Sequence, residues 1–279
     1  MSRLLKQPGI AAPAAMLLLI LLLALVGPWL TPHAFDTIDF EADWGAAPSA
    51  ANGHWFGTDE LGRDLFARVC VGGRLSLAVG IVSTLVSLAI GVVYGAVAGF
   101  VGGRVDALMM RIVDILYALP FMFFVILLMV LFGRHWLLIF VAIGAVSWLD
   151  MARIVRGQTL ALRRREFVDA AVVSGLGTAA IIRRHIVPNL LGVVVVYATL
   201  TIPQVILVES FLSFLGLGIQ EPATSWGALV NDGARAMEST PWGLLFPAAF
   251  LALTLLCLNL LGDALRDALD APALRRMAG

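Results

Sequence analysis

The residues whose side chains could support covalent chemistry are few and scattered along this 279-residue sequence. Its histidines and cysteines are His33, His54, His135, His185, Cys70 and Cys257. Neither set has the spacing of a metal site or of a nucleophile with its base. Acidic residues lie near His33 and His54, which leaves a metal site open there, but solvated loop histidines are the preferred interpretation. We expect no catalytic, cofactor-binding or metal-binding residue, and we interpret both cysteines as buried free thiols.

A site for nucleotide hydrolysis is excluded by the near absence of lysine. The only lysine is Lys6. A P-loop requires the pattern G-x-x-x-x-G-K-[ST], and the neighbours of Lys6 do not supply it. If the protein depends on ATP, the ATP and its Mg²⁺ must therefore be bound by a different chain.

The composition indicates that the elements positioning these residues lie in lipid. Hydrophobic residues make up 60% of the chain and charged residues 14%, whereas soluble proteins carry about 25% charged residues. Six stretches lack Asp, Glu, Lys and Arg, and most are long enough for a membrane-spanning helix, which needs about 20 apolar residues. These stretches are 7–35, 75–103, 115–133, 135–149, 185–208 and 239–262. We predict an all-α polytopic membrane protein with six transmembrane helices.

Two details of these spans are expected from their ends. The fourth stretch is short, and we expect its helix to continue through Asp150 and Arg153, whose side chains can reach the interface. Spans three and four should form a tight hairpin around residues 133–135.

The first stretch has a basic start, as a cleaved signal peptide has, but its apolar run is longer than the usual 7–15 residues and lacks a clear cleavage site. We expect it to be retained as a helix.

The orientation follows from the basic residues in the loops. With the N-terminus inside, 14 of the 19 Lys and Arg residues fall on the inner side and 5 on the outer side. Basic residues are enriched in cytoplasmic loops. We therefore predict that both termini and the segment 157–188 are cytoplasmic.

Several residues within the spans predict contacts or breaks. Gly91, Gly95 and Gly99 lie on one helix face, which favours a close contact with another helix, in this chain or in a partner. Pro120 should kink the third span and could help to line a pathway. Glu209 lies near the outer end of the fifth span, where it is either a pathway or gate residue or a group facing interfacial water.

The charged residues of the third span allow two interpretations. Asp106 and Asp114 flank Arg111 at helical spacing. Local ion pairing at the interface is the simpler interpretation, and a role in permeation is the alternative.

The outer segments suggest surface features. Thr58 or Asp59 could cap a short surface helix that ends at Val69, before the second span. Trp226 and Trp242 fit an interfacial aromatic belt. The polar residues between them suit either a solvated loop or contact with a protein on the outer side; they include Glu221, Asn231 and Asp232.

The most informative polar segment is 163–188. Residues 158–174 have the composition of one helix, which Gly175 and Gly177 should end. Thr178 could cap a second helix over 179–187, with Arg183, Arg184 and His185 near its negative C-terminal end and Pro188 at the start of the fifth span. Ala170, Ala171 and Gly175 should form a stripe of small residues that another surface can approach closely.

This segment resembles the cytoplasmic "EAA" loop of ABC-importer permeases. Its ordered features are an acidic residue followed by two alanines, a spaced glycine, an apolar turn and a proline. Asp169 replaces the usual Glu, His185 replaces the usual Ile, and Val187 replaces Leu. The resemblance implies that the loop docks into an ATPase subunit through Glu166, Asp169, Ala170, Ala171, Gly175, Arg183, Arg184, His185 and Pro188.

The resemblance extends over residues 50–272. Runs such as HWFGTDELGRDLFARV, VSWLDMARIVRGQTLALRRREFVDAA and ESFLSFLGLGIQEPATSWGALVNDGA are similar to C permease subunits of oligopeptide importers. Dipeptide and nickel permeases share several of these runs, so the solute stays open. The family implies a type I ABC-importer fold, with an N-terminal anchor and outer segment over 1–73 and a permease core over 74–279.

The same resemblance implies the partners and the location. They are a homologous second permease subunit, two ATP-binding-cassette ATPase subunits that hold ATP and Mg²⁺, an extracytoplasmic substrate-binding protein and membrane lipid, without nucleic acid. The location is the bacterial inner membrane.

Two other classes of protein make different predictions. A self-sufficient channel or secondary transporter should have paired charges in mid-membrane and an internal repeat, and we find neither in the sequence. A membrane-embedded hydrolase would need a catalytic constellation at one depth, which the scattered histidines do not provide.

Overall fold

The computed structural model describes residues 8–38, 44–132 and 136–277. Over these residues the regular structure is helical, apart from an isolated bridge between Thr58 and Asp64. In chain order the elements are α1 (Pro8–Val26), the 3-10 turn η1 (Gly27–Trp29), α2 (Leu65–Val101), α3 (Gly103–Ala118), α4 (Phe121–Phe132), α5 (Trp136–Leu162), α6 (Glu166–Val173), α7 (Thr178–Ile181), the π turn η2 (Ile182–Ile186), α8 (Val187–Phe214), α9 (Trp226–Arg235) and α10 (Trp242–Met277).

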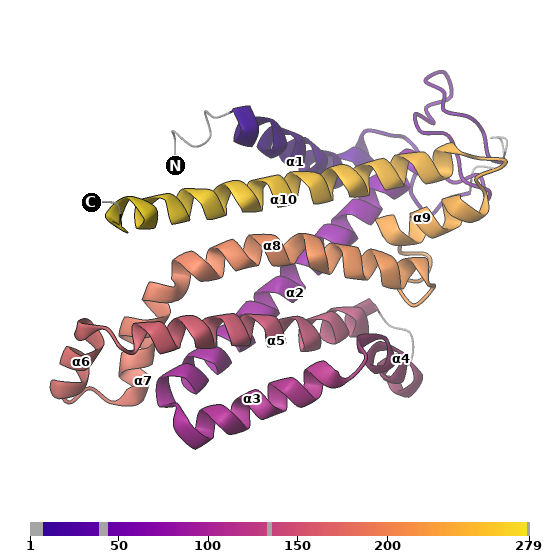
Figure 1. Ribbon diagram of the computed structural model, residues 1–279. Helices are drawn as coiled ribbons and strands as arrows, with labels where there is room; N and C mark the ends of the chain where they lie inside the picture. The colour runs from indigo at the N-terminus through magenta and orange to yellow at the C-terminus, as the bar shows by residue number, and fades with distance from the viewer. Residues whose placement is uncertain (1–7, 39–43, 133–135, 278–279) are drawn as a thin grey trace.

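The long helices give the molecule two distinct ends (Figure 1). At one end lie α6 and α7, together with the start of α1 and the last turns of α10. At the other end lie α9 and the long connection between α1 and α2. We call these the α6 end and the α9 end. The first and last helices thus begin and finish at the end that carries the segment 163–188.

The helices confirm an all-α chain with several membrane-length elements. Four segments are long and apolar enough to cross a membrane: 10–29, 65–101, 178–214 and 242–268. The bent pair formed by α3 and α4 raises this to as many as five if it counts as one span. Helix α5 runs through Asp150 and Arg153 to Leu162, as expected. The hairpin predicted at 133–135 lies outside the described residues.

The most extensive helix contact joins α2 to α5. A Cβ atom added to Gly91 would lie 2.6 Å from Cβ of Met151, and one added to Gly99 would lie 2.8 Å from the carbonyl oxygen of Arg156. At Gly95 the added atom would meet the carbonyl oxygen of Ala152. These distances leave no room for a side chain. The close contact predicted from the three glycines is confirmed, and its partner is a helix of the same chain.

The predicted break at Pro120 is also confirmed. Helices α3 and α4 are bent by 80° about it. Leu119 has an extended backbone, with φ −73° and ψ 129°, because a proline disfavours the helical conformation in the residue before it.

The ion pairs of α3 correct one prediction. Asp106 and Asp114 do not pair with Arg111 but with residues of α5. Asp106 accepts two hydrogen bonds from Arg156, at 2.5 and 2.6 Å, and Asp114 accepts one from Arg153 at 2.8 Å. The helical spacing in the sequence could not reveal that a neighbouring helix offers better-placed guanidinium groups.

The predicted surface helix that ends at Val69 is wrong. Asp64 is the N-cap of α2, where its Oδ2 accepts a hydrogen bond from the amide of Ala67 at 2.8 Å. From there α2 continues for 37 residues without interruption. The acidic cap lies five residues after Asp59 and six after Thr58, the two caps that we expected, and the helix is continuous with the span.

Cys70, Cys257 and Trp226 lie inside the protein. Both Cys70 and Cys257 are buried free thiols, as predicted. Trp226 is also buried, and its indole N–H donates to the carbonyl oxygen of Val69 at 2.9 Å. Its predicted place in an interfacial belt is therefore wrong.

His54 corrects the interpretation of the loop histidines. It is 1% exposed, its Nδ1 lies 2.9 Å from Oδ1 of Asp64, and its ring stacks on His33. It is a packed structural residue instead of a solvated one. Within the described ranges no three His, Cys, Asp or Glu side chains come together in a way that could hold a metal.

We expect Gly95→Ala to destabilise the protein by about 1–3 kcal/mol, because the added methyl group forces apart two close-packed helices. Thermal unfolding of the purified protein in detergent measures this change. Gly192→Ala is the matched control, since an added Cβ at this helical glycine of α8 meets nothing within 4 Å. Equal unfolding temperatures for the two variants would contradict the role of the glycine contact.

Candidate docking segment and membrane cavity

The segment 163–188 begins with a break that the sequence did not predict. Helix α5 ends at Leu162, and a turn leads to Arg165, whose extended backbone precedes α6. The single helix predicted over 158–174 is therefore wrong. Gly175 ends α6 as predicted, and its φ of +78° is a conformation that favours glycine. The break makes α6 a separate short helix.

The second half of the segment also differs from the prediction. Gly177 occupies the N-cap position, and no side chain caps α7. The helix does not end at residue 187: α7 passes through the π turn η2 into α8, giving one helical segment over 178–214. The basic residues 183–185 therefore lie within a continuous helix and not at a negative helix end.

The π turn explains how the helix passes Pro188. A proline in a helix lacks the amide hydrogen and clashes with the carbonyl of the preceding turn. In η2 the amide of Val187 bonds to the carbonyl oxygen of Ile182, five residues back. This wider turn makes room for the Pro188 ring at the start of α8.

Helix α6 is fixed to the rest of the protein by one face. Val168 and Ala171 are buried in a hydrophobic cluster that includes Val155 of α5, Ile181 of α7 and Ile186 of η2. Of the small residues predicted to share a stripe, only Ala171 faces this cluster. Ala170 and Gly175 are exposed. The predicted stripe is therefore divided between the inner and outer faces of the segment.

The other face of α6 is open and combines acid with apolar groups. Glu166 and Asp169 are exposed in its first turn, where carboxylates are favoured by the helix dipole. Phe167, Val172 and Val173 are also exposed, and Val173 is 87% accessible. Val173 lies on the face opposite Val168 and Ala171, whereas Phe167 and Val172 flank the buried face as their neighbours four residues away. None of the three is among the docking residues that the resemblance implied.

The basic part of the segment flanks α6. Arg183, Arg184 and Pro188 are exposed, and His185 is half-buried with its ring 6.5 Å from that of Phe167. The predicted docking residues thus lie on α6, its C-terminal turn and the first turns of the long 178–214 helix. Only Ala171 among them is buried.

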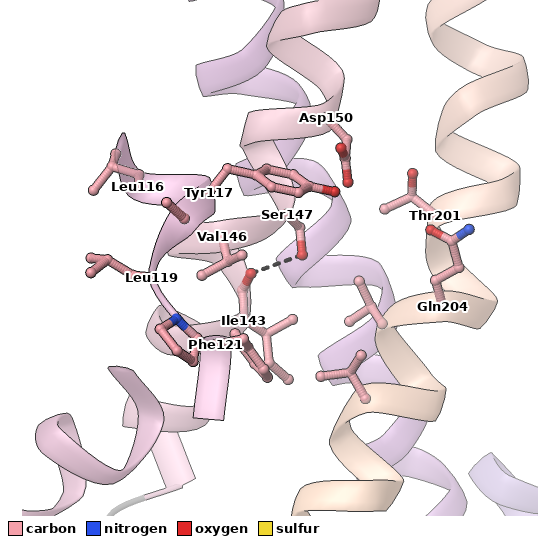
Figure 2. A pocket seen from close by; sticks show the side chains of 14 residues that line it. Leu116, Tyr117, Leu119, Phe121, Ile143, Val146, Ser147, Asp150, Thr201 and Gln204 are labelled. Carbon is pink, nitrogen blue, oxygen red and sulfur yellow. Dashed lines mark hydrogen bonds between the residues drawn. The ribbon is translucent and has the colours of Figure 1, made fainter. Parts of the chain in front are cut away.

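A cavity of about 480 Å³ lies at the bend between α3 and α4. Figure 2 shows Tyr117 and Asp150 on one side of it and Thr201 and Gln204 of α8 on the other. Pro120 lines the cavity, as do apolar residues of α3, α5 and α8. The break at Pro120 therefore opens a space that a straight helix would fill.

Glu209 does not line this cavity and does not face water. It is 0% exposed, and its two oxygens accept hydrogen bonds from the hydroxyls of Ser76 at 3.0 Å and Ser213 at 2.7 Å. The hydroxyl of Ser76 in turn accepts from the amide of Trp226 at 3.2 Å. Glu209 thus joins α2, α8 and the start of α9. Its exposure to interfacial water was a wrong expectation, and a pathway or gate role stays a prediction.

An ionic cluster at the α9 end was not predicted. Arg63 donates to Asp59 at 2.7 Å and to Glu221 at 2.8 Å. The buried Arg68 lies 3.5 and 3.6 Å from the same two carboxylates. Burial opposes the charge of Arg63, but the hydrogen bond to Glu221 and the charge of Asp59 raise the pKa of its guanidinium above the ordinary value. The cluster joins the segment before α2 to the segment before α9.

Comparison with known proteins identifies the family. Residues 91–275 match the model of the family described as "Binding-protein-dependent transport system inner membrane component". The chain belongs to this family. Residues 1–48 also match the "N-terminal TM domain of oligopeptide transport permease C".

Relatives extend the similarity over nearly the whole of this transport-system component. It is 58% identical to the oligopeptide transport system permease protein OppC of Escherichia coli K12 over 268 residues, which cover 96% of this chain and 88% of the relative. It is 55% identical to OppC of Haemophilus influenzae over 93% of this chain and 84% of the relative. It is 49% identical to the dipeptide transport system permease protein DppC of Bacillus subtilis over 98% and 85%.

We expect Glu209→Leu to destabilise this membrane component by about 1–3 kcal/mol, because it leaves buried serine hydroxyls without an acceptor. Thermal unfolding in detergent, together with protease sensitivity of the α9 region, measures the effect. Glu209→Gln should lose less stability because one acceptor oxygen remains. A Leu variant as stable as the wild type would show that the hydrogen bonds do not hold α9 in place.

Proposed function

We propose that this chain is a permease subunit of an ATP-binding-cassette importer for oligopeptides in the bacterial inner membrane. The support is the similarity to OppC proteins of two bacteria at 55–58% identity over more than nine tenths of the chain. As a second candidate solute, dipeptides are favoured by the 49% identity to DppC of Bacillus subtilis. Competition between labelled peptides of different lengths for uptake separates the two.

We propose that the chain spans the membrane six times with a type I ABC-importer fold and cytoplasmic termini. Residues 1–73 would form the anchor helix with its outer segment, and residues 74–279 the permease core. The common position of the start of α1, the end of α10 and α6 at one end of the molecule supports placing all three on one side (Figure 1). The excess of basic residues predicts that this side is the cytoplasm.

The proposed translocation pathway needs a second, homologous permease subunit to complete it. An extracytoplasmic substrate-binding protein would deliver the solute at the α9 end. Pro120 and the cavity beside it would contribute to this pathway, and Glu209 would hold the outer elements that surround its entrance. None of these residues performs covalent chemistry in this proposal.

Energy would enter through α6. The chain contains no P-loop lysine, so two partner ATPase subunits would bind ATP and Mg²⁺. The single observation that carries this proposal is the open face of α6, where Val173 is exposed while Val168 and Ala171 fix the helix to the core. A short helix held in this way can dock into another protein without losing its own support.

The proposed motion follows from the connection of α6 to α8. Movement of an ATPase subunit would displace α6 and the start of the 178–214 helix, which continues to the cavity and to Glu209. Such a displacement changes the balance of inward- and outward-facing states only if ATP-bound partners contact one state better.

We expect Val173→Asp to reduce ATPase co-purification and ATP-dependent peptide uptake at least tenfold, because it places a charge in the docking surface without touching the core. Pull-down of the assembled complex and uptake into proteoliposomes measure these effects. Met237→Asp is the matched control for ATPase binding, since it places the same charge at an exposed apolar residue of the opposite, α9 end. Normal ATPase binding by the Val173 variant would contradict the proposed docking surface, and peptide flux through this chain alone would favour a self-sufficient transporter.

A further inference from the structure

A carboxylate, that of Asp150, lines the cavity beside Pro120. Among the described residues that line it, Asp150 alone carries a charge at neutral pH. No hydrogen bond or ion pair joins Asp150 to another described residue, and the side chain is exposed. An ionisable group within an apolar membrane helix is a candidate functional residue, because keeping a charge there is costly.

The neighbouring cation does not neutralise Asp150. Arg153 lies three residues later on α5, but its guanidinium donates to Asp114 of α3 at 2.8 Å. It also lies over the ring of Tyr117, 4.3 Å from the ring centre. The charge of Arg153 is therefore paired with Asp114 of α3. The carboxylate of Asp150 then gives the cavity a net negative charge, which attracts cations.

Several groups around Asp150 can accept hydrogen bonds. The hydroxyls of Ser147 and Thr201 donate to carbonyl oxygens of their own helices, at 2.8 and 2.7 Å. Their oxygen lone pairs are left to accept. Gln204 adds an amide on the facing side, with an oxygen that can accept and an NH2 group that can donate (Figure 2). A carboxylate with several nearby neutral acceptors matches an ammonium group, which has three donors and no acceptor.

The same set of groups is less suited to a metal ion. Divalent cations bound by proteins take several ligands from carboxylates, imidazoles or thiolates. In the part of the chain that the structure describes, no group of three such side chains exists. The rest of the cavity wall is apolar, with residues such as Leu116, Leu119 and Val205, and the volume of about 480 Å³ is typical of sites for small organic ligands.

We propose that Asp150 binds the protonated α-amino group of a peptide during its passage, with Thr201 and Gln204 as accessory acceptors. This assignment rests on the proposed function as a peptide permease. In this arrangement the apolar cavity wall contacts the peptide side chains, which vary between peptides. The Asp150 carboxylate contacts the α-amino group, which all linear peptides share. The site would therefore select for a free amino end and against anionic solutes.

The test uses the complete transporter in proteoliposomes, with the second permease, both ATPases and the binding protein loaded with trialanine. Asp150→Asn should lower ATP-dependent trialanine uptake at least tenfold, while the binding protein still stimulates ATP hydrolysis to within twofold of wild type. Asp150→Glu should restore most of the uptake, since it keeps the charge. Asp263→Asn, which removes an exposed carboxylate of α10, is the matched control and should transport normally.

Three results would overturn the assignment. The first is trialanine uptake by the Asn variant within twofold of wild type. The second is an equal loss of ATPase stimulation and complex assembly that the Glu variant does not repair, which would make Asp150 structural. The third is loss of uptake for Ala-Lys-Ala only, which would assign the carboxylate to a lysine side chain.

The proposed function has its own readout in the same experiment. ATP-dependent accumulation of trialanine by the wild-type complex tests the function, whereas the ratio of variant to wild type tests Asp150.

Discussion

The close approach of the α2 and α5 backbones is the contact on which the rest of the structure depends. In lipid there is no hydrophobic force between apolar helices, so close packing and polar bonds must hold them together. Gly91, Gly95 and Gly99 allow this approach along two turns of α2. The bidentate pair of Asp106 and Arg156 then fixes α3 to the same helix. The position of α5 is thereby determined from two sides.

The proposed docking segment and the cavity both depend on the position of α5. Its Met151 and Val155 belong to the hydrophobic cluster that supports α6, and its Ser147 and Asp150 line the cavity. The proposed docking segment and the cavity are therefore supported by the same helix, within three turns of each other. A change in how α5 packs against α2 would reach both.

Helix α8 provides a second physical connection. The helical segment from Thr178 to Phe214 is continuous and carries Ile186 in the α6 cluster, Thr201 in the cavity and Glu209 in the outer network. At about 1.5 Å per residue, Ile186 and Thr201 lie roughly 22 Å apart along the axis. The same helical segment therefore contacts the α6 cluster, the cavity and the outer network, which supports the proposal that α8 connects them.

The sequence allowed prediction of those features that a single residue or a short pattern determines. The glycine face of α2, the break at Pro120 and the end of α6 at Gly175 each reflect backbone geometry that few residues permit. Features that depend on tertiary partners were missed. Asp106 and Asp114 pair with arginines of another helix, and the indole N–H of Trp226 donates to a buried carbonyl oxygen of α2. Periodicity also could not show the break before α6.

The burial of Glu209 and His54 also could not be predicted from the local sequence. Both are polar residues in segments where exposure was a reasonable expectation. Their burial depends on Ser76 and Asp64, which come from distant parts of the chain or from a turn that caps α2. A local pattern gives no information about such partners. The cavity carboxylate Asp150 was likewise noted only as a group that could reach the interface.

The π turn before Pro188 determines the rotational setting of α8. A π turn holds one residue more than an α turn, and the proline ring prevents it from relaxing to ordinary α geometry. Relaxation by one residue would rotate all that follows by about 100° around the helix axis. Thr201 and Gln204 would then point away from the cavity. Which side chains of α8 line the cavity therefore depends on a proline about four helical turns away.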